Sequence, residues 1–119
     1  DFHGLKVIGI NPNEDKNYPL DSFENMKKMV SSGKVNFTYL RDEKQEVAKT
    51  YGAICTPDPF LFDSKLKLIY HGRIDDVHGE RTATRHELYE IIKGYIEQGI
   101  IPKSDNPSLG CSIKWKYTN

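Results

Sequence analysis

The stretch Tyr51-Gly-Ala-Ile-Cys-Thr-Pro-Asp-Pro-Phe-Leu-Phe-Asp63 decides how the chain is interpreted. Tyr51 and Gly52 are typical of a helix that ends at a left-handed glycine. Phe60, Leu61 and Phe62 have the apolar and aromatic density of a buried strand. The backbone must therefore turn between these two elements, and the turn carries a cysteine and two prolines.

Length and charge restrict the classes of protein. A chain of 119 residues is long enough for one core and too short for two. Its 17 basic and 17 acidic residues balance, so no net field favours nucleic acid or an acidic membrane surface. No segment approaches the roughly 18 consecutive apolar residues of a membrane span. We therefore expect neither a nucleic-acid partner nor a membrane.

The two cysteines, Cys55 and Cys111, lie far apart in the sequence. They cannot form a disulfide-dense scaffold, and they lack the close pairing of zinc ligands. The histidines and the pair Asp75 and Asp76 also lack metal-ligand spacing, so we expect no metal and no cofactor. The cysteine usage favours a reducing, cytoplasmic compartment.

The hydrophobic pattern predicts alternating strands and helices. Three helices are predicted. The first runs from Asp21 to Gly33 and begins with Asp21 and Glu24, which resemble a capping box, and the second runs from Asp42 to Tyr51. The third is amphipathic, begins with a capping box at Thr84 to Glu87 and ends at Gly99. Strands are predicted over Leu5 to Ile10, Phe37 to Leu40, Phe60 to Phe62 and Leu66 to His71. The short connection between the last two strands predicts an antiparallel hairpin. Early alternation with helices favours parallel pairing, so we expect an α/β fold with one mixed sheet.

Several of these motifs resemble one family. They are Leu5 to Ile10, the Asp42 to Gly52 pattern, Cys55-Thr-Pro57 with Phe60 to Asp63, the Leu66 to Tyr70 strand and Gly72-Arg-Ile-Asp-Asp76. Together they are similar to the later part of peroxiredoxin-like proteins, the thioredoxin-fold redoxin group of alkyl hydroperoxide reductase and thiol-specific antioxidant proteins. The Gly72 to Asp76 stretch and the closing Gly110-Cys-Ser-Ile-Lys-Trp115 resemble a bacterial branch of that group.

The resemblance implies a thioredoxin-like fold, with helices flanking a mixed sheet, that is truncated at its N-terminus. The first core strand, the following helix and the active-site cysteine motif have no counterpart in this sequence. Residues 1–101 would form the incomplete redoxin domain, and residues 102–119 an extended, mobile tail. We expect the missing segment, or another chain, to complete the sheet.

The resemblance also implies the site. Pro57 would follow a cis peptide bond, and the backbone at Thr56 and Pro57 would bind substrate peptides as an added strand. Cys55 and Cys111 are the candidate catalytic residues, as accessory or resolving thiols, although each can also be read as an ordinary thiol. No arginine lies between Tyr51 and Asp63, where many peroxiredoxins carry one. Arg73 is near enough in sequence to be considered as a substitute, or it is a solvated or ion-paired surface residue.

Two functions remain open. The first is a thiol-disulfide oxidoreductase or antioxidant domain, without its main cysteine motif, acting on a thiol or disulfide protein or on a peroxide. The second is a redox-inactive thioredoxin-fold module that binds a partner beside Pro57.

Overall fold

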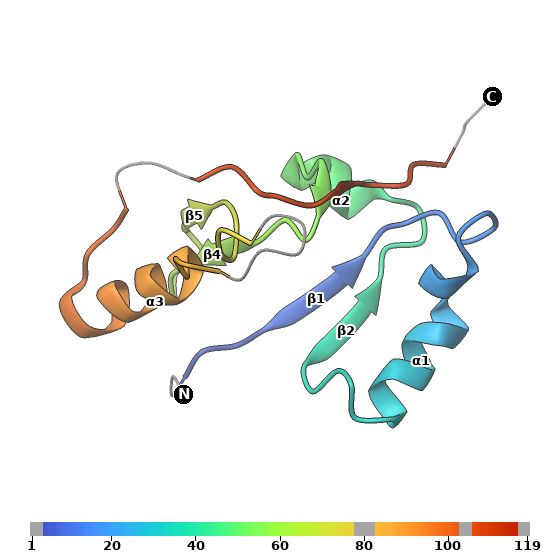
Figure 1. The fold of residues 1–119 in the computed structure, drawn as a ribbon, viewed down its shortest axis with the longest axis horizontal. Coiled ribbons are helices and arrows are strands. Elements are labelled where there is room, and N and C mark those ends of the chain that lie inside the picture. The colour runs from blue at the N-terminus through green and yellow to red at the C-terminus, as the bar shows by residue number, and fades with distance from the viewer. Residues whose placement is uncertain (1–3, 78–82, 103–105, 117–119) are drawn as a thin grey trace. The chain divides into compact units, whose positions relative to one another are not determined.

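A computed structural model gives the fold of the chain and describes residues 4–77, 83–102 and 106–116. The chain divides into two compact units, Asp1–Ala53 with Ile113–Asn119 and Ile54–Ser112. Figure 1 traces the elements of each unit along the chain.

The first unit contains a parallel pair of strands. Strand β1 (Ile8–Asn11) pairs with β2 (Thr38–Arg41), with Gly9 opposite Tyr39 and Ile10 opposite Leu40. Gly9 fits this position because a Cβ atom there would lie 3.2 Å from the Tyr39 ring and still nearer to the ring of Phe37. The parallel pairing predicted from the sequence is confirmed.

Helix α1 (Phe23–Ser31) connects the two strands and buries Met26. The predicted helix is confirmed, but its predicted cap is wrong. The N-cap is Ser22, whose hydroxyl oxygen accepts a hydrogen bond from the backbone N–H of Asn25, whereas Asp21 belongs to the preceding 3-10 turn η1 (Pro19–Asp21). A serine in extended conformation supplies this acceptor as well as an aspartate does.

Helix α2 (Glu46–Tyr51) is shorter than predicted because the residues before it act as its cap. The Asp42 carboxylate accepts hydrogen bonds from the backbone N–H groups of Val47 and Ala48. Gln45 is in the left-handed conformation, so the helix cannot extend back through it. Gly52 ends the helix in the left-handed conformation, as its sequence position predicts.

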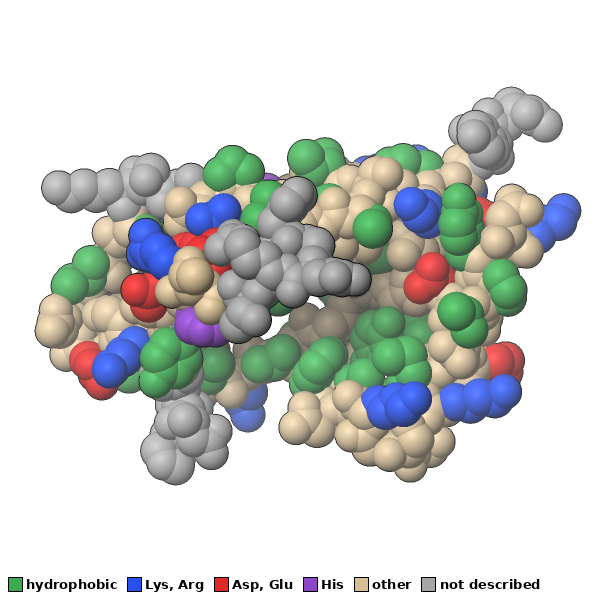
Figure 2. Space-filling model, in the orientation of Figure 1, with side chains coloured by type: hydrophobic (Ala, Val, Ile, Leu, Met, Phe, Trp, Pro, Cys, Tyr) green, Lys and Arg blue, Asp and Glu red, His purple; other side chains and the backbone are tan. Residues whose placement is uncertain are grey.

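One face of the β1 and β2 pair is apolar and exposed. Side chains alternate along a strand, so Ile8, Ile10 and Leu40 share the face opposite to that of Tyr39, which lies against α1. Their exposed fractions are 60%, 42% and 48%. Figure 2 shows hydrophobic side chains gathered over these strands.

The second unit contains two antiparallel pairs and a helix. Strand β4 (Phe60–Phe62) pairs with β5 (Leu68–His71) and forms the predicted hairpin, in which Ile69 and Tyr70 are buried. Strand β3 (Cys55–Thr56) pairs with β6 (Cys111–Ser112). Helix α3 (Glu87–Gln98) follows the hairpin and ends at Gly99, as predicted.

The capping box predicted for α3 is wrong. The N-cap is His86, and its side chain makes no capping hydrogen bond. Thr84 instead bonds through its N–H and its hydroxyl to the buried Asp76, which also accepts from the N–H of Arg85. The Glu87 carboxylate accepts a hydrogen bond from Arg73 instead of bonding to the start of the helix. The backbone N–H of Leu88, in the first turn of α3, donates to the carbonyl oxygen of Ile74, so a backbone group from elsewhere in the unit replaces the local cap.

In the part of the chain that the structure describes, the strand pairs do not join into the single mixed sheet that the sequence predicts. Parallel and antiparallel pairs both occur there, as three two-stranded sheets. Within the described residues, β1 pairs only with β2, and β4 pairs only with β5. Each of these two strands therefore has one edge without a hydrogen-bonded strand beside it.

Residues 108–116 of the C-terminal tail make specific contacts with the rest of the chain. Residues 111 and 112 form β6, Ile113 is buried, and Lys114 and Lys116 are hydrogen-bonded through their backbone N–H groups. The sequence gives little sign of this because the contacts of the segment are to residues far away in the chain.

Candidate functional site

The turn at Pro57 lies between β3 and β4, and the Thr56–Pro57 peptide bond is cis. In the β3 and β6 ladder, Cys55 faces Ser112 and Thr56 faces Cys111. All four residues selected from the sequence, Cys55, Thr56, Pro57 and Cys111, therefore lie within one small region of the second unit.

The two thiols do not face each other. Directly opposed residues in an antiparallel ladder share a face, and successive residues alternate, so Cys55 and Cys111 project to opposite faces. Both are free, Cys55 is buried and Cys111 is exposed. This arrangement does not favour a disulfide between them.

The environment of Cys55 favours the protonated thiol. Burial raises the pKa of Cys55, and the nearby negative charge of Asp58 raises it further, against weaker lowering by hydrogen bonds from Ser108 and Gly110. The Sγ atom lies 3.7 Å from the carbonyl oxygen of Pro57, to which the thiol donates. Because the thiolate is the nucleophile, Cys55 has the properties of a packed thiol more than those of an attacking one.

Asp58 is the residue of this region that sequence reasoning missed. Its side chain is 4% exposed. Oδ1 lies 2.7 Å from Nε2 of His71 and accepts from the Ser108 hydroxyl at 2.7 Å, and Oδ2 accepts from the N–H of Ile54 at 3.3 Å. The ring of His71 also stacks on Phe60 at 4.0 Å. The available signal was an aspartate placed between two prolines, a position that favours side-chain bonds to nearby backbone.

Gly110 brings the closing motif against this turn. A Cβ atom at Gly110 would collide with the Thr56 carbonyl group and lie 3.0 Å from the Pro57 nitrogen. The motif Gly110 to Trp115 thus begins with a residue whose lack of a side chain allows β6 to approach β3.

Arg73 is held away from a free, substrate-polarising role. Its Nη2 atom donates to Oε1 of Glu87 at 2.9 Å, and the Glu87 side chain is 1% exposed. The Tyr70 hydroxyl donates to the Arg73 carbonyl oxygen, and the Arg73 N–H donates to the carbonyl oxygen of Asn106. The Gly72 to Asp76 motif therefore joins the hairpin, α3 and residue 106.

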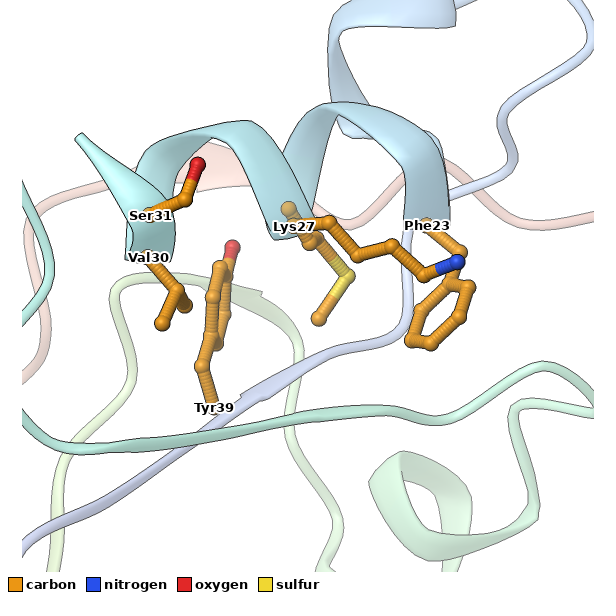
Figure 3. A pocket seen from close by; sticks show the side chains of 6 residues that line it. Phe23, Lys27, Val30, Ser31 and Tyr39 are labelled. Atoms are coloured by element: carbon orange, nitrogen blue, oxygen red, sulfur yellow. The ribbon is translucent and has the colours of Figure 1, made fainter.

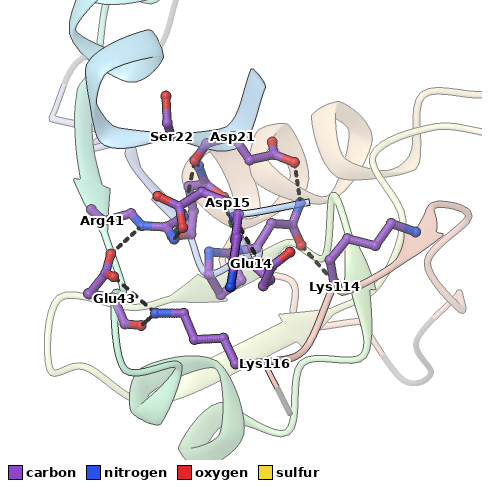
Figure 4. A network of polar contacts seen from close by, with 12 residues as sticks. Glu14, Asp15, Asp21, Ser22, Arg41, Glu43, Lys114 and Lys116 are labelled. Atoms are coloured by element: carbon purple, nitrogen blue, oxygen red, sulfur yellow. Dashed lines mark hydrogen bonds and ion pairs between the residues drawn. The ribbon is translucent and has the colours of Figure 1, made fainter. Parts of the chain in front are cut away.

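A polar network in the first unit holds residues 114–116 (Figure 4). The Gln45 amide donates to the carbonyl oxygens of Pro12 and Lys114 and accepts from the N–H of Lys116, while the N–H of Lys114 donates to Asn13. Hydrogen bonds from Lys116 and then Arg41 lower the pKa of Glu43. The hydrogen bonds of Gln45 and Asn13 hold the backbone of residues 114–116 in place, so this network has a structural role.

A small pocket lies between α1 and β2 (Figure 3). Its volume is about 260 Å³, and its lining residues are Phe23, Met26, Lys27, Val30, Ser31 and Tyr39. Burial, with a smaller effect of Asp21, raises the pKa of Tyr39. The pocket is smaller than most ligand sites and holds no convergent set of reactive groups.

In the described ranges, no three His, Cys, Asp or Glu side chains come together as metal ligands, and His78 lies outside those ranges. None of the helices among the described residues is long and apolar enough to cross a membrane.

Comparison with known proteins identifies the family. A model described as the AhpC/TSA family matches residues 1–71. The structure is similar to that of a hypothetical protein from Sinorhizobium meliloti 1021, with a TM-score of 0.87 and 36% identity over 97% of this chain and 64% of that chain. It is also similar to an uncharacterized conserved protein from Geobacillus kaustophilus, with a TM-score of 0.84 and 41% identity over 96% of this chain and 61% of that one. No curated protein matches.

The chain thus spans less than two thirds of the length of these two structures. Both the family match, which extends over more than half of the chain, and the strong likeness to these structures lead to one conclusion: the chain belongs to the AhpC/TSA family, a thioredoxin-like redoxin family.

Proposed function

We propose that the protein to which this chain belongs carries out thiol-dependent redox chemistry, with the turn at Pro57 as its contact site. The observation that carries the proposal is the pairing of Cys111, an exposed thiol, with Thr56 immediately before Pro57. Membership of the AhpC/TSA family supports thiol chemistry in general. Thiol-disulfide exchange is favoured over peroxide reduction because Arg73, the candidate substitute for the missing arginine, is engaged by Glu87.

In this proposal Cys111 is the resolving thiol. Its thiolate attacks one sulfur of a disulfide, a new S–S bond forms, and the second sulfur of the disulfide leaves as a thiolate that takes up a proton. The disulfide is reduced as Cys111 is oxidised, so the electrons balance. The disulfide belongs either to a partner protein or to a part of the full-length protein outside this chain. Cys55 is an accessory thiol that supports the turn by packing.

We also propose that a segment outside this chain completes the sheet. Strands β1 and β4 each leave one edge unpaired within the described residues, and Ile8, Ile10 and Leu40 present an exposed apolar face. Unpaired edges attract other strands, and apolar faces require cover. The similar structures are longer than this chain and leave room for such a segment.

Mass spectrometry of the full-length protein tests the redox proposal. The protein is treated in parallel with a protein disulfide and with hydrogen peroxide, and the state of each cysteine is then mapped in the unaltered protein and in Cys111→Ser and Cys55→Ser variants. We expect Cys111 in a disulfide after the first treatment, Cys55 mostly reduced, and loss of exchange in Cys111→Ser alone. If neither cysteine is ever oxidised, the redox proposal fails.

A second candidate function is a redox-inactive module that binds a partner beside Pro57. The neutral, buried thiol of Cys55 favours it. This candidate predicts that Cys111→Ser leaves partner binding unchanged and that no cysteine changes its oxidation state during the same treatments.

A further inference from the structure

A buried carboxylate connects three parts of the second unit beside the turn at Pro57. The Asp58 side chain is 4% exposed, and its Oδ1 atom lies 2.7 Å from Nε2 of His71 and 2.7 Å from the hydroxyl oxygen of Ser108. His71 belongs to β5, whereas Ser108 precedes β6. Because both partners bond to the same oxygen atom, a change of charge at one of them alters the bond to the other.

Ser108 extends these contacts to Cys55. Its hydroxyl donates to Asp58, and a hydrogen bond from the same hydroxyl lowers the pKa of Cys55. A hydroxyl has one proton to donate, so it cannot serve the carboxylate and a thiolate at the same time. We call His71, Asp58, Ser108 and Cys55 the Asp58 cluster. The cluster therefore has two arrangements, which differ in the acceptor of the hydroxyl proton.

The first arrangement holds a neutral thiol. The thiol of Cys55 donates to the carbonyl oxygen of Pro57, and the hydroxyl of Ser108 donates to Asp58. The Asp58 carboxylate repels a second negative charge on the nearby sulfur. While His71 is neutral, the cluster therefore keeps Cys55 protonated.

Protonation of His71 reverses this balance. Histidine is the side chain whose charge ordinarily changes between about pH 5 and 8. An imidazolium 2.7 Å from Asp58 compensates the negative charge and donates to the carboxylate, which frees the Ser108 proton for the sulfur of Cys55. The N–H of Gly110 is a second donor to this sulfur. Both changes stabilise the thiolate.

The two ends of the cluster differ in their access to solvent. Among the described residues, Asp58 is the charged group that shifts the pKa of Cys55. His71 faces the same carboxylate and, from β4, the uncharged ring of Phe60, which stacks on the imidazole at 4.0 Å. The His71 side chain is 33% exposed, so it exchanges protons with solvent, whereas Cys55 is buried.

We propose that the charge of His71 controls whether Cys55 ionises, and that the Asp58 cluster is a switch for this second thiol of the turn. His71, Asp58 and Ser108 are positioning residues in this switch, since they act on the sulfur and not on a substrate. The inference rests on the proposed thiol chemistry at the turn and adds its regulation. As the pH falls, the reactivity of Cys55 should decline less steeply than that of Cys111.

The test measures how fast methyl methanethiosulfonate modifies each cysteine of the full-length protein at pH 5.5 and pH 8.5, with mass spectrometry to map the sites. A thiolate attacks the sulfenyl sulfur of this small reagent, forms a methyl disulfide and releases methanesulfinate. His71→Gln keeps a nitrogen donor for Asp58 but carries no charge. His86→Gln, the same change at an exposed histidine, is the matched control.

The readout is the rate of Cys55 modification in the unaltered protein divided by the rate in His71→Gln. We expect this ratio to be about three- to tenfold larger at pH 5.5 than at pH 8.5, because an imidazolium forms as the pH falls through this range. The corresponding ratio for His86→Gln should be the same at both pH values. A variant that only loosens the fold changes the rate by a similar factor at every pH, so the pH dependence separates the switch from a structural role.

Asp58→Asn removes the carboxylate that connects the two ends of the cluster. We expect it to speed the modification of Cys55 at both pH values and to abolish the pH dependence of the His71→Gln effect in the double variant. If His71→Gln or Asp58→Asn does not fold, His71→Asn or Ser108→Ala takes its place with the same criteria.

A ratio that is the same at pH 5.5 and pH 8.5 would overturn the proposal, and so would a ratio that keeps its pH dependence after Asp58 is replaced. Cys111, on the opposite face of the ladder, is the internal reference, and its rates should not respond to His71→Gln. The reagent is not a protein disulfide, so Cys55 can be followed even where exchange by Cys111 fails. Failure of this inference and failure of the proposed function are therefore distinguishable.

Discussion

Cys55 and Cys111 belong to adjacent strands but have opposite access to solvent, and access decides their chemistry. Cys111 is exposed, whereas Cys55 is 8% exposed and lies near the carboxylate of Asp58. A buried thiol beside a negative charge resists ionisation. The sequence identifies both cysteines as candidates, but it cannot separate them, because burial and charge come from residues distant in the chain.

The raised pKa of Cys55 predicts a stability that falls at alkaline pH. Its folded pKa lies above its unfolded value, so its contribution is fully present below the unfolded pKa, about 8.5 for a free thiol, and is lost as the pH rises through the folded pKa. Urea unfolding of the full-length protein at pH 7 and pH 9.5 measures the loss. Cys55→Ser should show a smaller loss than the unaltered protein, and Cys111→Ser should behave like the unaltered protein. A loss of equal size in Cys55→Ser contradicts this assignment.

Replacing Asp58 tests most directly whether its hydrogen bonds stabilise the turn at Pro57. Its carboxylate accepts three hydrogen bonds from Ile54, His71 and Ser108, and an amide cannot accept all of them with both of its terminal atoms. We expect Asp58→Asn to lower the free energy of unfolding by about 1–3 kcal/mol, the cost of unsatisfied buried groups. Glu97→Gln, the same chemical change at an exposed helical position, is the control and should have little effect. Equal unfolding midpoints for the two variants would show that Asp58 does not hold the turn.

At the scale of elements, hydrophobic periodicity in the sequence predicts helices and strands, whereas features that depend on contacts with residues distant in the chain are missed. Helix α3 follows from its apolar spacing, and the hairpin follows from the short connection at Asp63 to Lys65. The predicted capping box of α3 is wrong because its two members bond elsewhere: Thr84 bonds to Asp76, and Glu87 accepts from Arg73. Strand β6 was missed because two exposed residues have no periodicity, and their partner β3 is remote in sequence.

The Gly72 to Asp76 motif explains how β5 connects to the rest of its unit. A Cβ atom at Gly72 would lie 2.6 Å from the Tyr70 hydroxyl oxygen and would collide with the Asn106 carbonyl oxygen. We expect Gly72→Ala to cost roughly 1–3 kcal/mol of unfolding free energy through overpacking. Gly94→Ala, which meets open space inside α3, should instead stabilise by about 0.5–1 kcal/mol. Chemical denaturation of both variants measures the difference, and a neutral Gly72→Ala would show that Asn106 yields without cost.

At the scale of the whole molecule, the strands of the described ranges form three two-stranded sheets. An isolated two-stranded pair is marginal in water, so each pair depends on further packing for its stability. The resemblance implies a further strand, and β1 and β4 each leave one edge unpaired within the described residues. The strand pairings follow from local patterns, the parallel pair from alternation with helices and the hairpin from its short connection, whereas the expectation of a further strand comes from the family resemblance alone.

The last prediction concerns residues 1–119 by themselves. Ile8, Ile10 and Leu40 are exposed at 60%, 42% and 48%, and covering them in the full-length protein removes apolar surface from water. Folded domains are stable by only about 5–15 kcal/mol in total, so a few uncovered side chains and unpaired backbone groups decide the outcome. We expect the 119-residue chain to show no cooperative monomeric thermal transition by calorimetry, or to associate, whereas the full-length protein unfolds cooperatively. Sedimentation at several concentrations identifies association. A sharp, concentration-independent transition of the monomeric 119-residue chain would contradict the prediction, because it would mean that the two units need neither another strand nor a cover for the apolar face.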